Sequence, residues 1–183
     1  MNIYIAKDEA FNFIYRETVD WLRTQGTVRF FSPMRDEAIP MEADLIYLPG
    51  GYPEFFLEPL SHSHSTMHSL RRTHARIIAE CGGMMYLSQG IDQYDMTGLL
   101  PFRTTMQSAR LHLGYRRVML NGQEFHGHEF HYSSIQGTPP PGTIQLLDAQ
   151  GHPVSTGLYL QGNILASYLH WAPGQLPIHL LGE

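Results

Sequence analysis

A single cysteine and a distant histidine are the side chains in this sequence best suited to covalent catalysis. Cys81 is the only cysteine in the chain of 183 residues, and the histidine is His170. A thiolate nucleophile needs a base within hydrogen-bond reach and N–H donors for the oxyanion that forms when it attacks a carbonyl. The sequence therefore predicts a nucleophilic cysteine if the fold brings such groups to Cys81.

The residues around Cys81 predict a strand, a tight turn and a helix. A β-branched apolar run at 77–78 precedes the cysteine, and residues 84–87 favour a helix. Ala79 and Gly83, two positions before and after Cys81, are small enough for the sharp turn of a nucleophile elbow. Such a turn exposes Sγ at a helix N-terminus, where the helix dipole stabilises a thiolate. The alternative is a buried cysteine that serves only as a small hydrophobe.

His170 is the predicted general base, because it stands at the end of a strand that the pattern predicts over residues 164–169. Gly50 and Gly51 follow another predicted strand. Their N–H groups, with that of Gly82 after the nucleophile, are suited to bind an oxyanion. The alternatives are a histidine that only binds a strand-end carbonyl and an ordinary glycine turn.

The first half of the chain predicts alternating strands and helices. Strands are predicted just before the cysteine and at residues 2–6, 28–31 and 44–48, and helical segments at 15–24 and 55–73. This alternation favours an α/β sandwich with a mainly parallel sheet. Loops at strand ends, where the glycines and the cysteine lie, carry function more often than strands do.

The second half of the chain predicts antiparallel strands. The predicted strands are residues 113–120, 127–133, 158–160 and 164–169, and the proline-rich residues 137–142 are a predicted loop. Between the first two strands, Asn121-Gly122 is a strong hairpin signal.

Composition restricts the class of protein. A chain of 183 residues, 43% of them hydrophobic, predicts one domain over 1–183 with one sizeable core. No apolar run approaches the roughly 20 residues that span a membrane, and the start does not resemble a signal peptide, so we expect a cytoplasmic protein. With a net charge of −5 and no basic run, nucleic acid is not an expected partner.

The remaining histidines do not predict a metal site. We interpret four histidines on or next to the polar helical stretch as solvated side chains, those at positions 62, 64, 68 and 74. His126 and His128 would share one face of a strand, but no third ligand is identifiable. We therefore predict no metal in this chain.

A series of motifs in register resembles one family of glutaminases. The motifs are residues 8–13, 31–37, 47–54, 79–87, 127–133 and 166–170. In this order they resemble the C-terminal glutaminase domain of cobyrinic acid a,c-diamide synthases of vitamin B12 biosynthesis, within the class I, triad-type glutamine amidotransferases. The resemblance implies a three-layer, flavodoxin-like α/β sandwich with a nucleophile elbow.

The resemblance also implies an activity and a set of site residues. The activity is hydrolysis of L-glutamine to glutamate and ammonia through a glutamyl thioester on Cys81, with His170 moving protons. The family's oxyanion donors and glutamine pocket correspond to two sets of residues: Gly50, Gly51 and Gly82 for the first, and Glu129, His131 and Ser133 for the second. For the second set, a strand whose polar side chains face water is an equal alternative.

The implied partner is an ATP-dependent synthetase domain or subunit that amidates the a and c carboxylates of a corrinoid. That synthetase domain is absent from this sequence, which contains no G-x-x-x-x-G-K-[ST] phosphate loop. ATP and Mg²⁺ are therefore expected on the partner, and no cofactor is expected in this chain.

One departure from the family pattern concerns the histidine. Ala172 stands two positions after His170, where most class I glutaminases have a glutamate and the cobyrinate branch usually has a second histidine. Another group must then orient His170. Two alternatives to a glutaminase remain: a non-catalytic module that only docks on a synthetase, and a cysteine hydrolase of the same fold. The intact Cys81 argues against the first, and the second leaves the strand at 127–133 unexplained.

Overall fold

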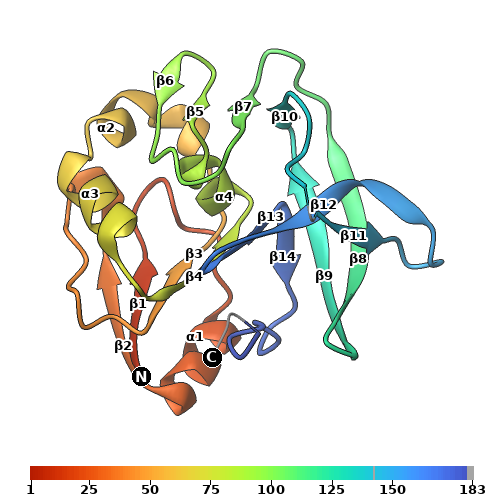
Figure 1. Cartoon of the computed structure of the whole chain (residues 1–183), viewed down its shortest axis with the longest axis horizontal. Coiled ribbons are helices and arrows are strands. Elements are labelled where there is room, and N and C mark those ends of the chain that lie inside the picture. The colour runs from red at the N-terminus through yellow and green to blue at the C-terminus, as the bar shows by residue number, and fades with distance from the viewer. Residues whose placement is uncertain (142, 181–183) are drawn as a thin grey trace.

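The strands of the chain form one long curled sheet and one small sheet (Figure 1). The computed structural model describes residues 1–141 and 143–180. In these residues the long sheet has the strand order β14-β9-β8-β11-β12-β13-β4-β3-β1-β2, and the small sheet has the order β10-β7-β5-β6.

The elements have the following bounds. The long sheet consists of β1 (Asn2–Ala6), β2 (Thr27–Phe31), β3 (Leu45–Leu48), β4 (Arg76–Glu80), β8 (His112–Leu120), β9 (Gln123–His131), β11 (Ile144–Leu147), β12 (Pro153–Gln161), β13 (Ile164–Ser167) and β14 (Leu169–Trp171). The small sheet consists of β5 (Gly90–Ile91), β6 (Tyr94–Asp95), β7 (Arg103–Thr105) and β10 (Ser134–Gln136). The helices are α1 (Arg16–Gln25), α2 (Leu57–Ser61), α3 (His64–Arg72) and α4 (Gly82–Leu87), with 3₁₀ turns η1 (Pro33–Arg35) and η2 (Pro53–Phe55).

The two halves of the chain build two different halves of the long sheet. Strands β2, β1, β3, β4 and β13 pair in parallel. Strands β12, β11, β8, β9 and β14 extend this block through antiparallel pairs, and in Figure 1 they lie away from the helices α2 and α3. The predicted α/β fold, with parallel strands first and antiparallel strands in the second half, is therefore confirmed.

Local signals placed most elements correctly. The helix predicted at 15–24 is α1, and the helical stretch predicted at 55–73 is divided into η2, α2 and α3. Asn121 and Gly122, with φ angles of 48° and 80°, form the tight turn between β8 and β9 that the sequence predicts. Residues 137–141 of the predicted loop have no helix or strand, and residue 142 lies outside the described residues.

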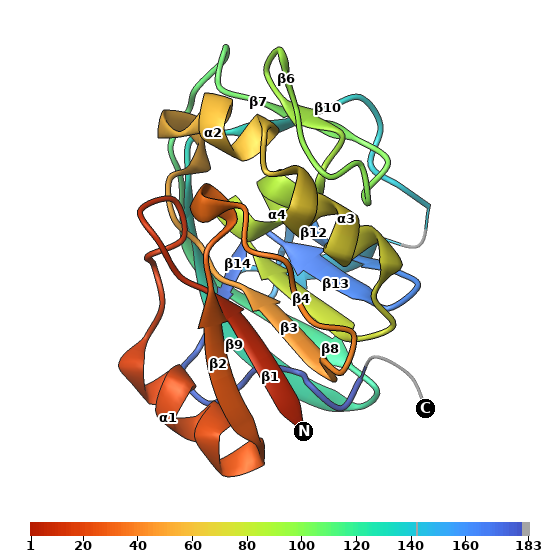
Figure 2. The same cartoon turned by 90° about the vertical axis from the view of Figure 1, so that its left-hand side faces the viewer.

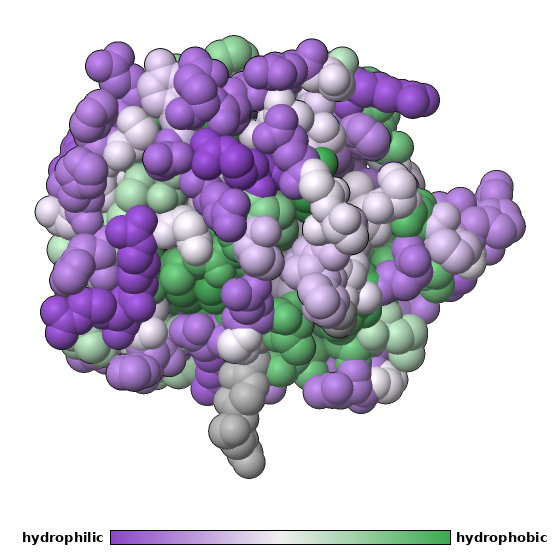
Figure 3. Space-filling view, turned by 45° about the horizontal axis from the view of Figure 1, so that its top comes forward, coloured by the Kyte–Doolittle hydropathy of each residue, from purple (hydrophilic) through white to green (hydrophobic). Residues whose placement is uncertain are grey.

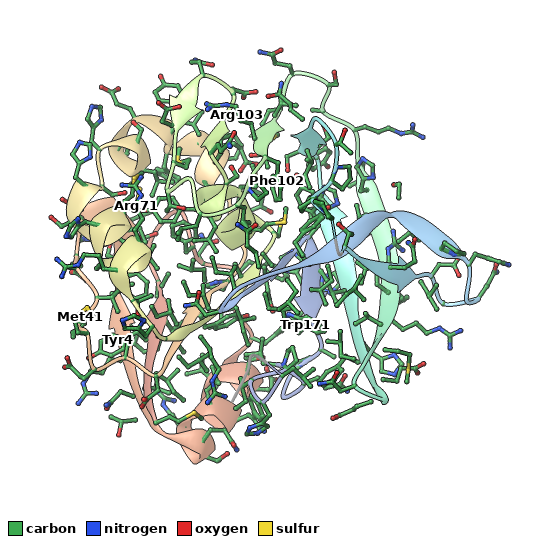
Figure 4. All side chains as sticks on the ribbon, viewed as in Figure 1. Tyr4, Met41, Arg71, Phe102, Arg103 and Trp171 are labelled. Atoms are coloured by element: carbon green, nitrogen blue, oxygen red, sulfur yellow. The ribbon has the colours of Figure 1, made fainter. Side chains whose placement is uncertain are left out.

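Alternation along the parallel strands creates a core on each face of the sheet. On β1, Ile3 and Ile5 belong to a cluster that contains Leu22 of α1 and Trp171, the last residue of β14, which is labelled in Figure 4. Tyr4 and Ala6 point the other way, into a second cluster formed with α2, α3 and α4. Helices therefore cover the parallel strands on both faces, as Figure 2 shows, and the sheet is the middle of three layers.

Two arginines bind the small sheet and the segment that follows β6 (Figure 4). Nε of Arg71, on α3, donates to the Thr97 carbonyl at 2.7 Å. Arg103, on β7, donates to the Asp92 carbonyl at 3.0 Å and pairs with the Asp95 carboxylate. Arg71 thereby holds the segment after β6 against α3, and Arg103 joins β7 to the β5–β6 hairpin.

Gly83 sets the distance between α4 and the neighbouring strand. A Cβ atom at this position would lie 2.2 Å from the carbonyl oxygen of Leu48, the last residue of β3. That oxygen belongs to the backbone of a buried strand and has no room to move aside. Only glycine therefore allows the first turn of α4 to pack against β3.

We predict that Gly83→Val lowers the free energy of unfolding by about 3 kcal/mol or prevents folding, because the new side chain overlaps the β3 backbone. Urea unfolding followed by circular dichroism measures this change. Ser65→Val is the control, since it adds the same side chain at an exposed position of α3. A Gly83→Val protein as stable as the control would show that α4 does not depend on this close contact.

Candidate active site

Cys81 lies on a sharp turn between β4 and α4. Its backbone angles are φ 41° and ψ −104°, an unusual conformation for a residue with a side chain. The Cys81 N–H donates to the Ser167 carbonyl at 2.7 Å, which anchors the turn to β13. The predicted strand, turn and helix are therefore confirmed. The predicted exposure of the Cys81 thiol is wrong, because the neighbouring strands leave this residue only 5% exposed.

His170 does not lie at the end of the strand predicted over residues 164–169. This predicted boundary was wrong, because β13 ends at Ser167 and the chain then leaves β4 to form β14 beside β9. The Ser167 hydroxyl donates to the Gly157 carbonyl and accepts from the Leu169 N–H, which stabilises the crossing. In β14, His170 is the register partner of His128 on β9.

Cys81 and His170 line the same small cavity. The other lining residues are Phe13, Gly51, Tyr52 and Phe130. The Cys81 Sγ lies 3.9 Å from the Phe130 carbonyl oxygen. The cavity has a volume of about 20 Å³, which is room for about one water molecule and far too little for an amino-acid side chain. Cys81 and His170 therefore share a site that is too small for a glutamine side chain.

The charges around His170 favour its protonated form. Its Nδ1 lies 3.5 Å from Oε2 of Glu80, and both side chains are buried. Burial lowers the pKa of His170, but the Cys81 and Glu80 side chains beside the ring outweigh burial and raise the pKa to about 10. The ring of His128 stacks on His170 with centroids 5.1 Å apart, and burial together with the His170 charge lowers the pKa of His128. The site thus suits an imidazolium beside a thiolate.

The three glycines predicted as oxyanion donors lie around these two side chains. A Cβ atom on Gly50 would be 2.3 Å from Cε1 of His170, so only glycine lets the ring occupy this place. A Cβ atom on Gly82 would be 3.2 Å from the Gly51 nitrogen, so the Gly51 N–H is next to the elbow. Within the described residues, neither the Gly51 nor the Gly82 N–H donates a hydrogen bond. Two such N–H groups beside a thiol are suited to bind an oxyanion.

Glu80 also belongs to this site, although the sequence patterns did not single it out. It is only 3% exposed, and its Oε1 accepts a hydrogen bond from the Trp171 N–H at 3.1 Å. The available signal was a carboxylate that directly follows the buried apolar residues 77–79 of a strand. Contact with His170 was not visible in the sequence, because β4 and β14 are far apart along the chain.

Glu129 does not line the cavity of Cys81. Because His128 is the register partner of His170, its neighbour Glu129 projects from the opposite face of β9. The Glu129 carboxylate accepts hydrogen bonds from Arg116 at 2.9 Å and from the Thr156 hydroxyl. It is 1% exposed, so its oxygens are used inside the protein. A role for Glu129 in binding glutamine stays a prediction.

His131 and Ser133 line a second cavity, of about 190 Å³. The His131 ring stacks on Tyr168 with centroids 3.6 Å apart, and burial lowers its pKa to about 3, so it is neutral at physiological pH. The Ser133 hydroxyl bonds to the Tyr168 hydroxyl at 2.9 Å. Tyr168 lies in the crossing from β13 to β14, but neither predicted pocket residue lines the cavity of Cys81. Their role in binding glutamine stays a prediction as well.

No group of three metal-ligating side chains, His, Cys, Asp or Glu, is arranged to hold a metal ion within residues 1–141 and 143–180. In the same residues, no helix combines the length and the apolar character that crossing a membrane requires.

Comparison with known families gives a match over nearly the whole chain. The model of the CobB/CobQ-like glutamine amidotransferase domain matches residues 2–175. A cobyrinate a,c-diamide synthase of Herminiimonas arsenicoxydans is 38% identical over 177 residues, which cover 92% of this chain and 40% of that protein. A hydrogenobyrinate a,c-diamide synthase of Rhizobium meliloti is 39% identical over 182 residues, covering 91% of this chain and 42% of that protein.

Solved structures share the fold at low sequence identity. A glutamine amidotransferase from Thermotoga maritima superimposes with a TM-score of 0.62 at 10% identity, covering 92% of this chain and 75% of that chain. PurLQS from the same organism gives a TM-score of 0.62 at 14% identity, covering 92% of this chain and 86% of that chain. At these identities the likeness concerns the fold alone.

We predict that Gly50→Ala slows alkylation of Cys81 by iodoacetamide at neutral pH about tenfold, because the new methyl group occupies the place of the His170 ring and displaces the imidazolium from the thiol. Mass spectrometry of the Cys81 peptide over time gives the rate.

The control is Gly162→Ala, in the turn between β12 and β13, where a Cβ atom meets nothing within 4 Å. It should leave the alkylation rate within about twofold of the original. An equal rate in both variants would mean that His170 does not control the reactivity of Cys81.

Proposed function

Because this chain belongs to the CobB/CobQ-like glutamine amidotransferase domain family, we propose that it hydrolyses L-glutamine to glutamate and ammonia. The observation that carries the proposal is the cavity in which the Cys81 elbow, His170 and Gly51 meet. Attack on a carboxamide needs a nucleophile, a proton carrier and oxyanion donors, and this cavity has a candidate for each.

The proposed reaction proceeds through a thioester. The Cys81 thiolate attacks the side-chain carbonyl carbon of glutamine, and the oxyanion accepts hydrogen bonds from the Gly51 and Gly82 N–H groups. His170 gives its proton to the amide nitrogen, which leaves as ammonia, so that a glutamyl thioester remains on Sγ. His170 then takes a proton from water, the hydroxide adds to the thioester carbonyl, and glutamate leaves as the thiolate is restored.

We propose that the ammonia is used by an ATP-dependent synthetase domain or subunit, which amidates the a and c carboxylates of cobyrinic acid or a closely related corrinoid. The support is the similarity to relatives named cobyrinate and hydrogenobyrinate a,c-diamide synthase. The chain spans only 40% and 42% of the length of those two relatives. ATP and Mg²⁺ would act on that partner rather than on this chain.

The surface around the cavity suits a contact with such a partner. Tyr52 and Phe130, which line the cavity, are 41% and 38% exposed. On β8, Leu113 and Tyr115 are 63% and 76% exposed, and they form a groove with His128, whose ring stacks on His170. We call Tyr52, Phe130, Leu113 and Tyr115 the apolar rim. Much of the surface in Figure 3 is hydrophilic, so exposed aromatic side chains beside the site indicate a contact surface.

We predict that Cys81→Ser reduces glutamate release at least about a thousandfold while circular dichroism stays unchanged, because a serine hydroxyl is barely ionised at neutral pH. A diazo ketone analogue of glutamine should alkylate Cys81 in the unaltered protein, and peptide mass analysis locates the adduct. Comparable glutamate release by the serine variant would remove Cys81 from the mechanism.

The same experiment separates the alternatives. A docking module without activity would show neither glutamate release nor a diazo ketone adduct, in the presence or absence of the partner. A cysteine hydrolase with another substrate would react with iodoacetamide but not with the glutamine analogue.

We further predict that the isolated chain is a slow glutaminase, because its cavity must open before glutamine can enter. Adding a matching synthetase with ATP, Mg²⁺ and cobyrinic acid should raise glutamate release about a hundredfold, as a shift of a few kcal/mol between closed and open states would do. Equal rates with and without the partner would make the chain an autonomous amidohydrolase.

Tyr115→Ser tests whether the apolar rim transmits this effect. It should weaken the stimulation about tenfold and leave the slow basal rate unchanged. Leu160→Ser is the control, because Leu160 is 48% exposed on β12 and lies outside the rim. If both variants respond to the synthetase alike, the partner contacts another surface.

A further inference from the structure

We propose that Glu80 is a positioning residue whose carboxylate holds the His170 ring in the orientation that proton transfer requires. This inference rests on the proposed glutaminase function and deepens it. Two positions after the histidine, where an acidic residue could otherwise orient the ring, stands Ala172, which has no carboxylate. The structure supplies a carboxylate from a different place, the residue directly before the nucleophile.

Glu80 is fixed between the nucleophile and the histidine. It is the last residue of β4, only 3% exposed, with Oε2 at 3.5 Å from Nδ1 of His170. Its Oε1 accepts the Trp171 N–H at 3.1 Å. The carboxylate is thereby bound to the backbone of the residue next to His170, so it keeps its position relative to β14.

The strand alternation of β4 directs Glu80 to this place. Ile78, two residues earlier, belongs to the core cluster that also contains Tyr47 and Trp171. Ala79 points the other way, into the cluster formed with α4. Glu80 therefore lies on the face of β4 that β14 covers, while Cys81 begins the turn into α4.

Glu80 is the negative partner that His170 needs besides the thiol. Burial, with the nearby Glu80 carboxylate, raises the pKa of Tyr47 well above its ordinary value, so this hydroxyl stays neutral. The same two effects raise the pKa of Tyr15, whereas burial and the charge of His170 lower the pKa of His128. None of these neighbours can balance an imidazolium at neutral pH.

A carboxylate at Nδ1 has two consequences for the chemistry. It keeps the proton on Nδ1, so that Nε2 remains for proton exchange with Cys81 and the leaving nitrogen. It also stabilises the imidazolium inside a buried site. Within the described residues, Nδ1 of His170 makes no hydrogen bond, and Oε2 of Glu80 lies within ion-pair distance of it. The 3.5 Å distance is longer than a tight hydrogen bond, which is common at catalytic contacts before a substrate binds.

The test is Glu80→Gln, which keeps the shape and the acceptor for the Trp171 N–H but removes the charge. We expect kcat for glutamine hydrolysis to fall about a hundredfold and KM to change less than about threefold. In addition, the pH at which the His170 ring loses its proton, measured by ¹⁵N NMR of the imidazole, should fall from about 10 toward 6.5. A merely structural role would not move this titration.

Two further variants complete the test. Glu80→Asp retains the charge with a shorter side chain, so it should keep most of the raised His170 titration and lose less of kcat than Glu80→Gln. Asp92→Asn is the control, because Asp92 also accepts hydrogen bonds inside the protein, from the Thr105 hydroxyl, but lies beside the small sheet. It should leave both readouts unchanged.

The proposal is overturned if Glu80→Gln keeps kcat within about twofold and the His170 titration unchanged. A His170 ring that loses its proton near pH 6.5 in the unaltered protein overturns it as well, even if Glu80→Gln fails to fold. If the unaltered protein hydrolyses no glutamine with its partner present, the proposed function fails. The His170 titration and the alkylation rate of Cys81 still measure the effect of Glu80 in that case.

Discussion

The strained backbone of Cys81 is the constraint on which the rest of the site depends. A residue with a side chain held at φ 41° and ψ −104° costs about 1–3 kcal/mol, and the surrounding structure must supply that energy. The stabilising interactions come from both sides of the turn. Before it, β4 is hydrogen-bonded between β3 and β13, and after it, α4 packs on β3 through a glycine that no larger residue can replace. The parallel strands and α4 thus fix the position of the thiol independently of the antiparallel strands.

The groups that surround the thiol come from β9 and β14, because the long sheet curls. The antiparallel strands continue from β13 and turn back, so that β9 and β14 reach the end of β4. This brings the Phe130 carbonyl to the Cys81 thiol, although the two residues are 49 positions apart in the sequence. His170 reaches the same place because the chain changes strand partners after Ser167. The parallel half therefore holds the Cys81 thiol, and the antiparallel half supplies the His170 imidazole and covers the site.

Burial favours the neutral form of both buried histidines, but only at His170 is it outweighed. The neighbouring Cys81 and Glu80 side chains raise the pKa of His170 to about 10. On the far side of β9, burial lowers the pKa of His131 to about 3, so that ring is neutral. The cavity of Cys81 and His170 has no space for an amino-acid substrate, while several aromatic side chains at the rim are exposed. A site that is assembled yet too small for its substrate, beside an apolar surface, is suited to control by a bound partner.

The sequence by itself determined much of the local structure, including the turn that carries Cys81. β-Branched runs, the small residues around Cys81 and the Asn121-Gly122 turn specify their elements through interactions between near neighbours, so these predictions were confirmed. Only the tertiary structure decided what surrounds His170. The strand change after Ser167 has no Gly or Pro to mark it, and it consists of a switch from pairing with β4 to pairing with β9. Because of that change, His170 lies on the face of β9 that carries His128 and not on the face that carries Glu129. Its carboxylate neighbour is therefore Glu80. A one-residue change of register reverses every side chain on a strand, so such contacts depend on pairing between distant segments that no local pattern contains.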